Sequence, residues 1–280
     1  MTATEAPSRP LRPAPNRPTL VALGLRQGAS ELRQFFRSRE QVVFTMAFPV
    51  LMIAIFGSIF SGDLGGGVSF TQYFVTGMIA SGLMTTGFQA LAIQIPIERD
   101  RGVLKRLRGT PMPPSVYFVG KVIMVAVIAV TETVILLAIS VPFFGVELPS
   151  TGTGWLTLAW VGALGITACT LCGIAFSSVA RSGRSAAAVA TPVALVLQFI
   201  SGVFFVFTQL PAWMQQVAAL FPLKWMCQGL RSVFLPAQFA SQEAAGTWEL
   251  GTVALVLAAW CVGGLLLCRS TFRWTTRRDG

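Results

Sequence analysis

The chain has 280 residues, of which 54% are hydrophobic and 11% are charged, and its net charge is +10. Soluble domains carry roughly 25% charged residues, so this composition excludes a soluble protein and predicts an all-α integral membrane protein. The basic residues are distributed as a membrane-topology signal, which argues against nucleic acid binding and favours membrane lipid as the anionic partner.

The first 41 residues divide into two segments. Residues 1–20 contain repeated Pro and Arg, which predicts a disordered cytosolic tail. Residues 21–41 have helical periodicity, with Leu25, Leu32 and Phe35 on one face and arginines on the other. A helix of this kind is expected to lie in the membrane interface, and a plain basic linker is the alternative.

Six apolar segments follow, each near the ~20 residues that cross a bilayer. The predicted spans are 42–60, 71–95, 121–144, 155–180, 186–207 and 247–268. They form one transmembrane unit over 42–268, followed by a basic cytosolic tail over 269–280. Of the 21 Lys and Arg residues, only Lys224 and Arg231 lie in loops on the second side of the membrane. Both termini are therefore expected in the cytoplasm.

The loop between the second and third predicted spans is short and heavily charged. Glu98 and Asp100 are expected to begin a short helix there and Arg108 to lie in its last turn, an order that suits the helix macrodipole. Leu104 and Leu107 give this helix a small apolar patch. The pattern predicts a compact cytosolic projection, and a solvated loop that only sets topology is the alternative.

Glu132 is a candidate functional residue because it lies near the middle of the third predicted span. An ionised carboxylate at that depth costs at least ~2.5 kcal/mol. It must therefore meet a partner, water or a translocation path, or be protonated. A place in the transport path and a structural hydrogen bond are equally open interpretations.

The loop between the fifth and sixth predicted spans has its own helical periodicity. Trp213 and Phe221 belong to the apolar face of a first short helix, and Pro222 breaks the pattern before a second one. We expect a re-entrant helical hairpin that dips into the outer leaflet, with Lys224 at or beside its water-facing tip. A surface loop anchored by Trp213 and Trp225 is the alternative.

Four stretches resemble ABC-2 type transporter permeases, in particular the daunorubicin-resistance type of drug-efflux permease. Residues 97–114 resemble the family's charged-loop motif. Residues 31–39, 48–51 and 210–223 resemble its interfacial helix, the proline of its first span and its outer hairpin. The resemblance covers about residues 22–275, and the charged-loop motif is its most specific part.

The resemblance implies a half-transporter. A six-span permease would pair with a second permease subunit, as homodimer or heterodimer, and bind two copies of a separate ABC ATP-binding subunit. Segment 97–110 would then be the cytosolic coupling helix, with six expected contact residues: Glu98, Arg101, Gly102, Leu104, Leu107 and Arg108. The chain has no phosphate-binding Gly-x-x-x-x-Gly-Lys-Ser/Thr motif, so we expect no enzyme activity here. ATP and Mg²⁺ would bind the partner, with no cofactor or metal in this chain.

The expected function is that of a permease in an ATP-driven ABC exporter of the multidrug-resistance kind. It would move an apolar or amphipathic substrate, drug-like or lipid-like, outward across the bacterial cytoplasmic membrane. A lipid-linked glycan exporter is one alternative, and a gradient-driven transporter that uses Glu132 as a proton site is another. A membrane enzyme is disfavoured because the chain has no His and no clustered carboxylates.

Overall fold

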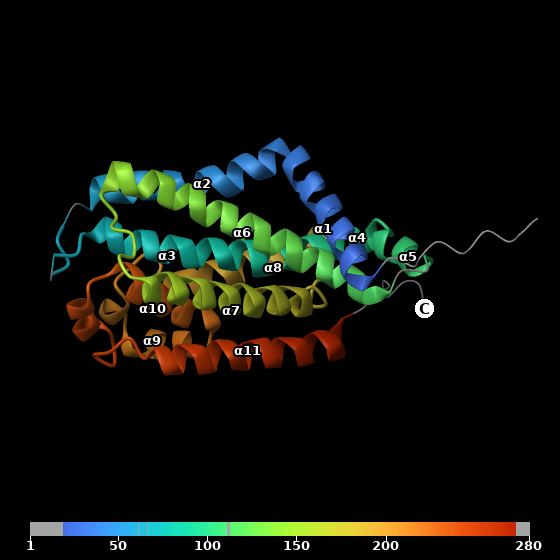
Figure 1. The fold of residues 1–280 in the computed structure, drawn as a ribbon. Coiled ribbons are helices and arrows are strands. Elements are labelled where there is room, and N and C mark those ends of the chain that lie inside the picture. The colour runs from blue at the N-terminus through green and yellow to red at the C-terminus, as the bar shows by residue number, and fades with distance from the viewer. Residues whose placement is uncertain (1–18, 61, 66, 111–112, 273–280) are drawn as a thin grey trace, which may run out of the picture.

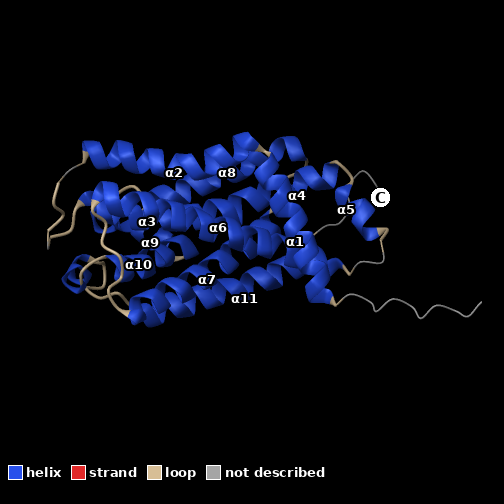
Figure 2. Ribbon diagram, turned by 45° about the horizontal axis from the view of Figure 1, so that its top comes forward, coloured by secondary structure: helices blue, strands red, loops and turns tan. Residues whose placement is uncertain are grey.

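The computed structural model describes residues 19–60, 62–65, 67–110 and 113–272, which form helices joined by loops (Figure 1, Figure 2). Within these residues, six helices are long and apolar enough to cross a membrane. The prediction of a six-span all-α membrane protein is thus confirmed. Nearly all of the predicted N-terminal tail and most of the C-terminal tail lie outside the described residues, as does Pro111 of the charged-loop motif.

The elements follow one another in the order of the predicted spans. They are α1 (Leu20–Arg37), α2 (Arg39–Ile59), α3 (Phe70–Met84), the π-helix η1 (Thr85–Gln89), α4 (Ala90–Asp100), α5 (Val103–Arg108), α6 (Pro114–Phe144), α7 (Gly152–Phe176), α8 (Gly183–Ile200), the 3₁₀ turn η2 (Phe207–Gln209), α9 (Ala212–Ala219), α10 (Pro222–Phe234), the 3₁₀ helix η3 (Ala237–Gln242) and α11 (Leu250–Thr271).

The fifth span is shorter than the predicted segment 186–207. α8 ends at Ile200, and Gly202 follows in the left-handed region with φ 78°. Glycine adopts this conformation without steric cost, so the chain can turn here although the sequence remains apolar. Val203 and Phe207 are buried in the turn that follows and were wrongly assigned to the span.

The second span is the central one. It runs from α3 through η1 to α4, and 72% of its most apolar window is buried inside the protein. A π-helix within an α-helix adds a residue to one turn and is frequent at functional sites. Here it lies in the middle of the span, where it contacts α6, α7 and α8. Gly82, one turn before η1, lets α6 approach closely, because a Cβ there would collide with the Glu132 carboxylate.

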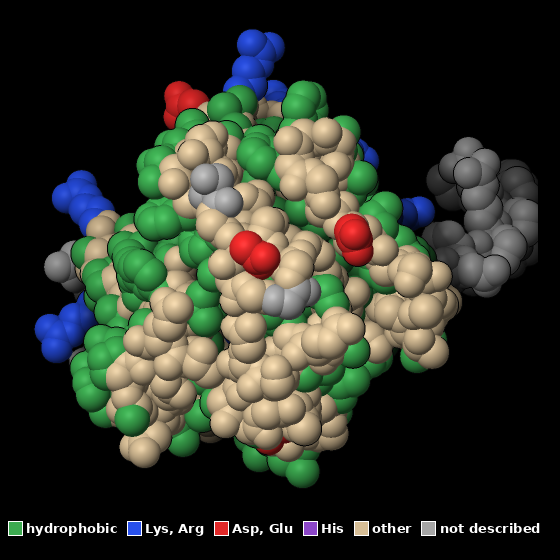
Figure 3. Space-filling view, turned by 90° about the vertical axis from the view of Figure 1, so that its left-hand side faces the viewer, with side chains coloured by type: hydrophobic (Ala, Val, Ile, Leu, Met, Phe, Trp, Pro, Cys, Tyr) green, Lys and Arg blue, Asp and Glu red, His purple; other side chains and the backbone are tan. Residues whose placement is uncertain are grey.

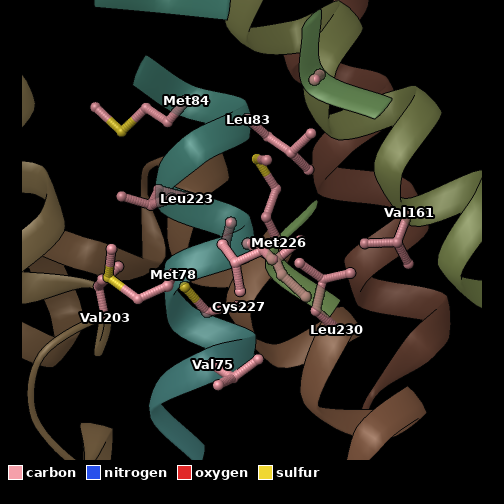
Figure 4. Packing of buried hydrophobic residues seen from close by; sticks show 14 of the residues in the cluster. Val75, Met78, Leu83, Met84, Val161, Val203, Leu223, Met226, Cys227 and Leu230 are labelled. Atoms are coloured by element: carbon pink, nitrogen blue, oxygen red, sulfur yellow. The ribbon is translucent and has the colours of Figure 1, made fainter. Parts of the chain in front are cut away.

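The hydrophobic core is built around α3 and α10. Figure 4 shows Met226 and Leu230 of α10 lying between Met78 of α3 and Val161 of α7. Each of these four side chains is almost fully buried. α10 is therefore a core element although it is too short to span a membrane.

The two ends of the bundle differ in charge. α5, the start of α1 and the end of α11 lie at one end, and α9 and α10 lie toward the other (Figure 1). The surface at the end opposite α5 shows a few acidic groups, with Lys and Arg only at its margins (Figure 3). Lys224 and Arg231, on α10, are both buried. An asymmetry of this kind is what the positive-inside rule describes.

Candidate functional site

The charged loop forms the end of one helix and the start of another. α4 continues through Glu98 to Asp100, and Gly102, with φ 70°, makes the left-handed turn from which α5 begins at Val103. Glu98 and Asp100 therefore end a long helix, and the prediction that they begin a short one was wrong. The helix continues to this point because Pro96, inside α4, does not stop it.

The apolar residues of α5 face the bundle. Leu104 is 0% exposed and packs in a cluster with Phe35, Leu91 and Tyr117, and the half-buried Leu107 packs against the same cluster. The expectation that Leu104 offers an apolar contact to a partner is wrong, because its side chain holds α5 on the protein. The exposed side chains around α5 are basic: Arg101, Lys105, Arg106 and Arg108.

Two hydrogen bonds fix the base of this projection. The Asp100 carboxylate accepts a hydrogen bond from the backbone N–H of Gly183 at 2.7 Å. The Arg99 guanidinium donates to the Ser177 carbonyl at 3.4 Å. The end of α4 is thus tied to the end of α7 and the start of α8, and α5 follows directly from this fixed point.

A buried ionic cluster lies directly behind this projection. The Lys121 ammonium, 0% exposed, forms ion pairs with Glu31 of α1 at 2.9 Å and with Glu98 of α4. The Tyr117 hydroxyl donates to the second Glu98 oxygen at 2.7 Å, and the Gln27 amide donates to Glu31 at 3.0 Å. This Lys121 cluster joins α1, α4 and α6.

Sequence reasoning missed the Lys121 cluster and expected Glu98 to be a contact residue for the partner. The available signal was Lys121 itself, a cation at the start of an otherwise apolar span. A buried ammonium needs carboxylate partners, and the nearby acidic residues could have been paired with it. The sequence does not indicate that Glu31, 90 positions away, supplies one of them.

A polar cavity of about 500 Å³ opens beside the cluster. It runs from Glu31 and Arg101 at the α5 end to Thr85 and Thr86 of η1. α1 and α2 form one side, η1 and α4 another, and α6 closes it with Met124 and Ile128. Its polar lining residues include Gln34, Ser38, Gln41, Thr45 and Gln94. A polar cavity thus extends from the α5 end to the middle of the second span.

Glu132 lies beyond the inner end of this cavity. It is 5% exposed, and its carboxylate accepts a hydrogen bond from the Thr86 hydroxyl at 3.1 Å. Thr86 lines the cavity, whereas Glu132 does not. The Glu132 carboxylate therefore contacts η1 and Gly82 from the α6 side.

The outer hairpin differs from its prediction in the second helix. Trp213 is 61% exposed on α9, but Pro222 and Lys224 are buried on α10. The Lys224 ammonium donates to the Gln228 amide and lies 3.5 Å from the centre of the Trp225 ring. Lys224 is therefore not a water-facing tip, because α10 is buried on every side and its polar residues bond within the core.

The turn between α9 and α10 packs against the middle of α11. The Trp260 indole donates to the Leu220 carbonyl at 3.0 Å, and its ring stacks on Phe221. Trp260 lies about 15 Å along α11 from the start of that helix, from the rise per residue. The turn with Phe221 and Pro222 thus reaches the middle of the span.

Comparison with known proteins identifies the family. The ABC-2 type transporter profile matches residues 28–235, which include α5, the polar cavity and α10. The chain belongs to the ABC-2 type transporter family. It is 25% identical over 213 residues to the inner membrane transport permease YadH of Escherichia coli K12, over 74% of this chain and 80% of that protein. YadH of Shigella flexneri matches equally.

Family membership establishes the general function. The chain is a transport permease and a multi-pass protein of the cytoplasmic membrane. ABC-2 type permeases are transport proteins, not enzymes, and they normally work with an ATP-binding subunit.

Proposed function

We propose that this ABC-2 permease is the membrane subunit of an ATP-driven exporter that moves an apolar or amphipathic substrate, drug-like or lipid-like, outward. The observation that carries the proposal is the rigid, basic α5 at one end of the bundle. The buried Leu104 packs α5 against the bundle, and the Asp100 hydrogen bond fixes the residues just before it. Arg106 and Arg108 are therefore exposed on a helix whose position is fixed. An acidic surface on the ATP-binding subunit would fit it.

The Lys121 cluster supplies the route by which force on α5 reaches the membrane. Glu98 lies in the last turn of α4, just before α5, and its ion pair passes through Lys121 to Glu31 of α1. α1 ends at Arg37 and α2 begins after a break at Ser38. A push on α5 would therefore move α4, α6 and α1 together and change the angle at Ser38.

The polar cavity is the proposed entry for substrate. Gln41, Thr45 and Gln94 line it, and hydrocarbon cannot satisfy such side chains. A second permease subunit, forming a homodimer or a heterodimer, would separate the cavity from lipid. Two ATP-binding subunits would bind the pair at the α5 end. The turn at Phe221 and Pro222 reaches mid-span and would close the outer half of the path.

The two alternatives receive less support. A gradient-driven transporter needs a carboxylate that water can reach, and Glu132 is bonded to Thr86 outside the cavity. The Glu132–Thr86 hydrogen bond joins α6 to η1, which is a structural role. A lipid-linked glycan would need a wide polar path for its sugars. The polar cavity of this chain, at about 500 Å³, is small for such a substrate.

The test is co-purification from source cells. A tagged chain, solubilised in mild detergent, should carry an ATP-binding subunit and Mg²⁺-ATP hydrolysis. Arg106→Glu with Arg108→Glu should remove at least about nine tenths of both, because two repulsive contacts replace two attractive ones. Arg33→Glu with Arg37→Glu, on exposed positions of α1 near the same end, is the matched control and should retain both. Equal retention in the two variants would disprove the α5 assignment.

A further inference from the structure

A second cavity, of about 320 Å³, is almost entirely apolar. It lies between α7, α8 and α11, with Phe176 on α7, Leu197 on α8 and Leu267 on α11 among its lining residues. α11 runs beside α7 along this side of the bundle (Figure 1). The wall residues Val193 and Leu197 are half-buried on α8, which has only 28% of its span buried inside the protein. The groove therefore lies at membrane depth on the side of the bundle.

The groove is closed at mid-span. Its inner end is formed by Phe221, Pro222 and Trp260, where the α9–α10 turn is hydrogen-bonded and stacked on α11. From Trp260 to the lining residue Thr271, α11 rises about 16 Å. The hydrocarbon of one leaflet is half of ~30 Å. The groove thus has the depth of a single leaflet, on the α5 side.

The other end of the groove adjoins a basic loop. Ser178 and Val179 form its rim, and the exposed Arg181 and Arg184 follow within the loop and the first turn of α8. This is the loop that Asp100 holds through Gly183, so its position is fixed. The structure therefore combines an apolar slot one leaflet deep with guanidinium groups at the depth of lipid headgroups.

We propose that this groove binds an acyl chain of one anionic phospholipid from the leaflet on the α5 side, with the phosphate held by Arg181 and Arg184. Arginine suits this role because its planar fork binds phosphate oxygens in pairs. The dead end at Trp260 excludes passage of the chain to the other leaflet. The lipid would be a bound component rather than cargo, so the proposal does not depend on how transport is driven.

A second apolar groove, of about 520 Å³ between α6 and α7, offers an internal control. Val130 and Gly162 line it, and no residue of the basic α7–α8 loop does. Its lipid contacts should show no preference for anionic headgroups. A difference between the two grooves therefore separates specific binding from ordinary lipid contact.

The experiment uses the purified chain in detergent and phosphatidylglycerol that carries a photoactivatable diazirine in one acyl chain. After irradiation, adducts mapped by peptide mass spectrometry should lie on α8 and α11 near Leu197 and Leu267. Unlabelled phosphatidylglycerol should compete at least about fivefold better than phosphatidylcholine, because a single basic residue near a membrane surface already gives about that preference.

Two kinds of variant separate headgroup from chain. Arg181→Gln with Arg184→Gln should abolish the preference for phosphatidylglycerol. Leu197→Trp should fill the groove and remove the adducts there, whereas Val130→Trp in the second groove should leave them. Val193→Phe is a milder change on the same wall and should lower the adducts if Leu197→Trp does not fold. Equal competition by both lipids, or adducts unchanged by both groove variants, would overturn the proposal.

Discussion

Two buried cations at opposite ends of the bundle are held in different ways. Lys121, at the α5 end, pairs with carboxylates from two other helices, α1 and α4. Arg231, toward the other end, pairs with Glu243, which follows η3, donates to the Gly202 carbonyl and lies over the Tyr73 ring. The first cluster joins helices that a partner would move, while the second fixes the outer hairpin in place.

We predict that removing the Lys121 charge lowers the free energy of unfolding more than removing the Arg231 charge. Lys121→Met would leave Glu31 and Glu98 buried together without a cation, and breaking a buried pair costs 3–5 kcal/mol. We expect the free energy of unfolding to fall by about 5 kcal/mol, the upper end of this range, because two carboxylates lose their partner. Reversible unfolding of the purified chain in detergent measures the loss.

A triple variant sharpens this expectation. Lys121→Met combined with Glu31→Gln and Glu98→Gln removes every charge of the cluster, so no unpaired ion remains. It should recover most of the lost free energy of unfolding, since neutral replacements of buried pairs are often tolerated. If the triple variant were as unstable as Lys121→Met, packing and not charge would explain the cluster.

Arg231→Met should cost less, about 3 kcal/mol, because one carboxylate, Glu243, is left behind. Lys224→Met, on the same helix, is the matched control. Its ammonium bonds the neutral amide of Gln228, so no carboxylate is left unpaired and the loss should be about 2 kcal/mol. The predicted order of destabilisation is Lys121, then Arg231, then Lys224, and a different order in the same unfolding assay would break the comparison.

The sequence predicted the spans well because each apolar run is long and bounded by charge or glycine. It failed where an apolar run contains a turn, as after Ile200, since Val203 and Phe207 are as apolar as a span. Periodicity also misled at α10. Lys224 was expected at or beside a water-facing tip, yet it is buried on α10, as are Gln228 and Arg231. Lys224 donates to Gln228, and Arg231 pairs with Glu243.

The sequence predicted a short helix after the second span, but not which of its side chains face the protein. The charge pattern and the family resemblance pointed to the loop after the second span, where α5 lies. Which side of a six-residue helix faces the protein depends on the residues below it. Leu104 is buried because it packs with Phe35 and Leu91 in one hydrophobic cluster. The residues next to Leu104 in the sequence do not predict these distant contacts.

The central claim is that α5 is where the ATP-binding subunit docks. Site-specific photo-crosslinking in source cells tests it most directly, with a photoreactive amino acid at Arg108 of α5 or at the exposed Gln216 of α9, near the other end. We predict a crosslink to the ATP-binding subunit from position 108 and none from position 216. A crosslink from position 216, or none from position 108 in a complex that still co-purifies, would contradict the account.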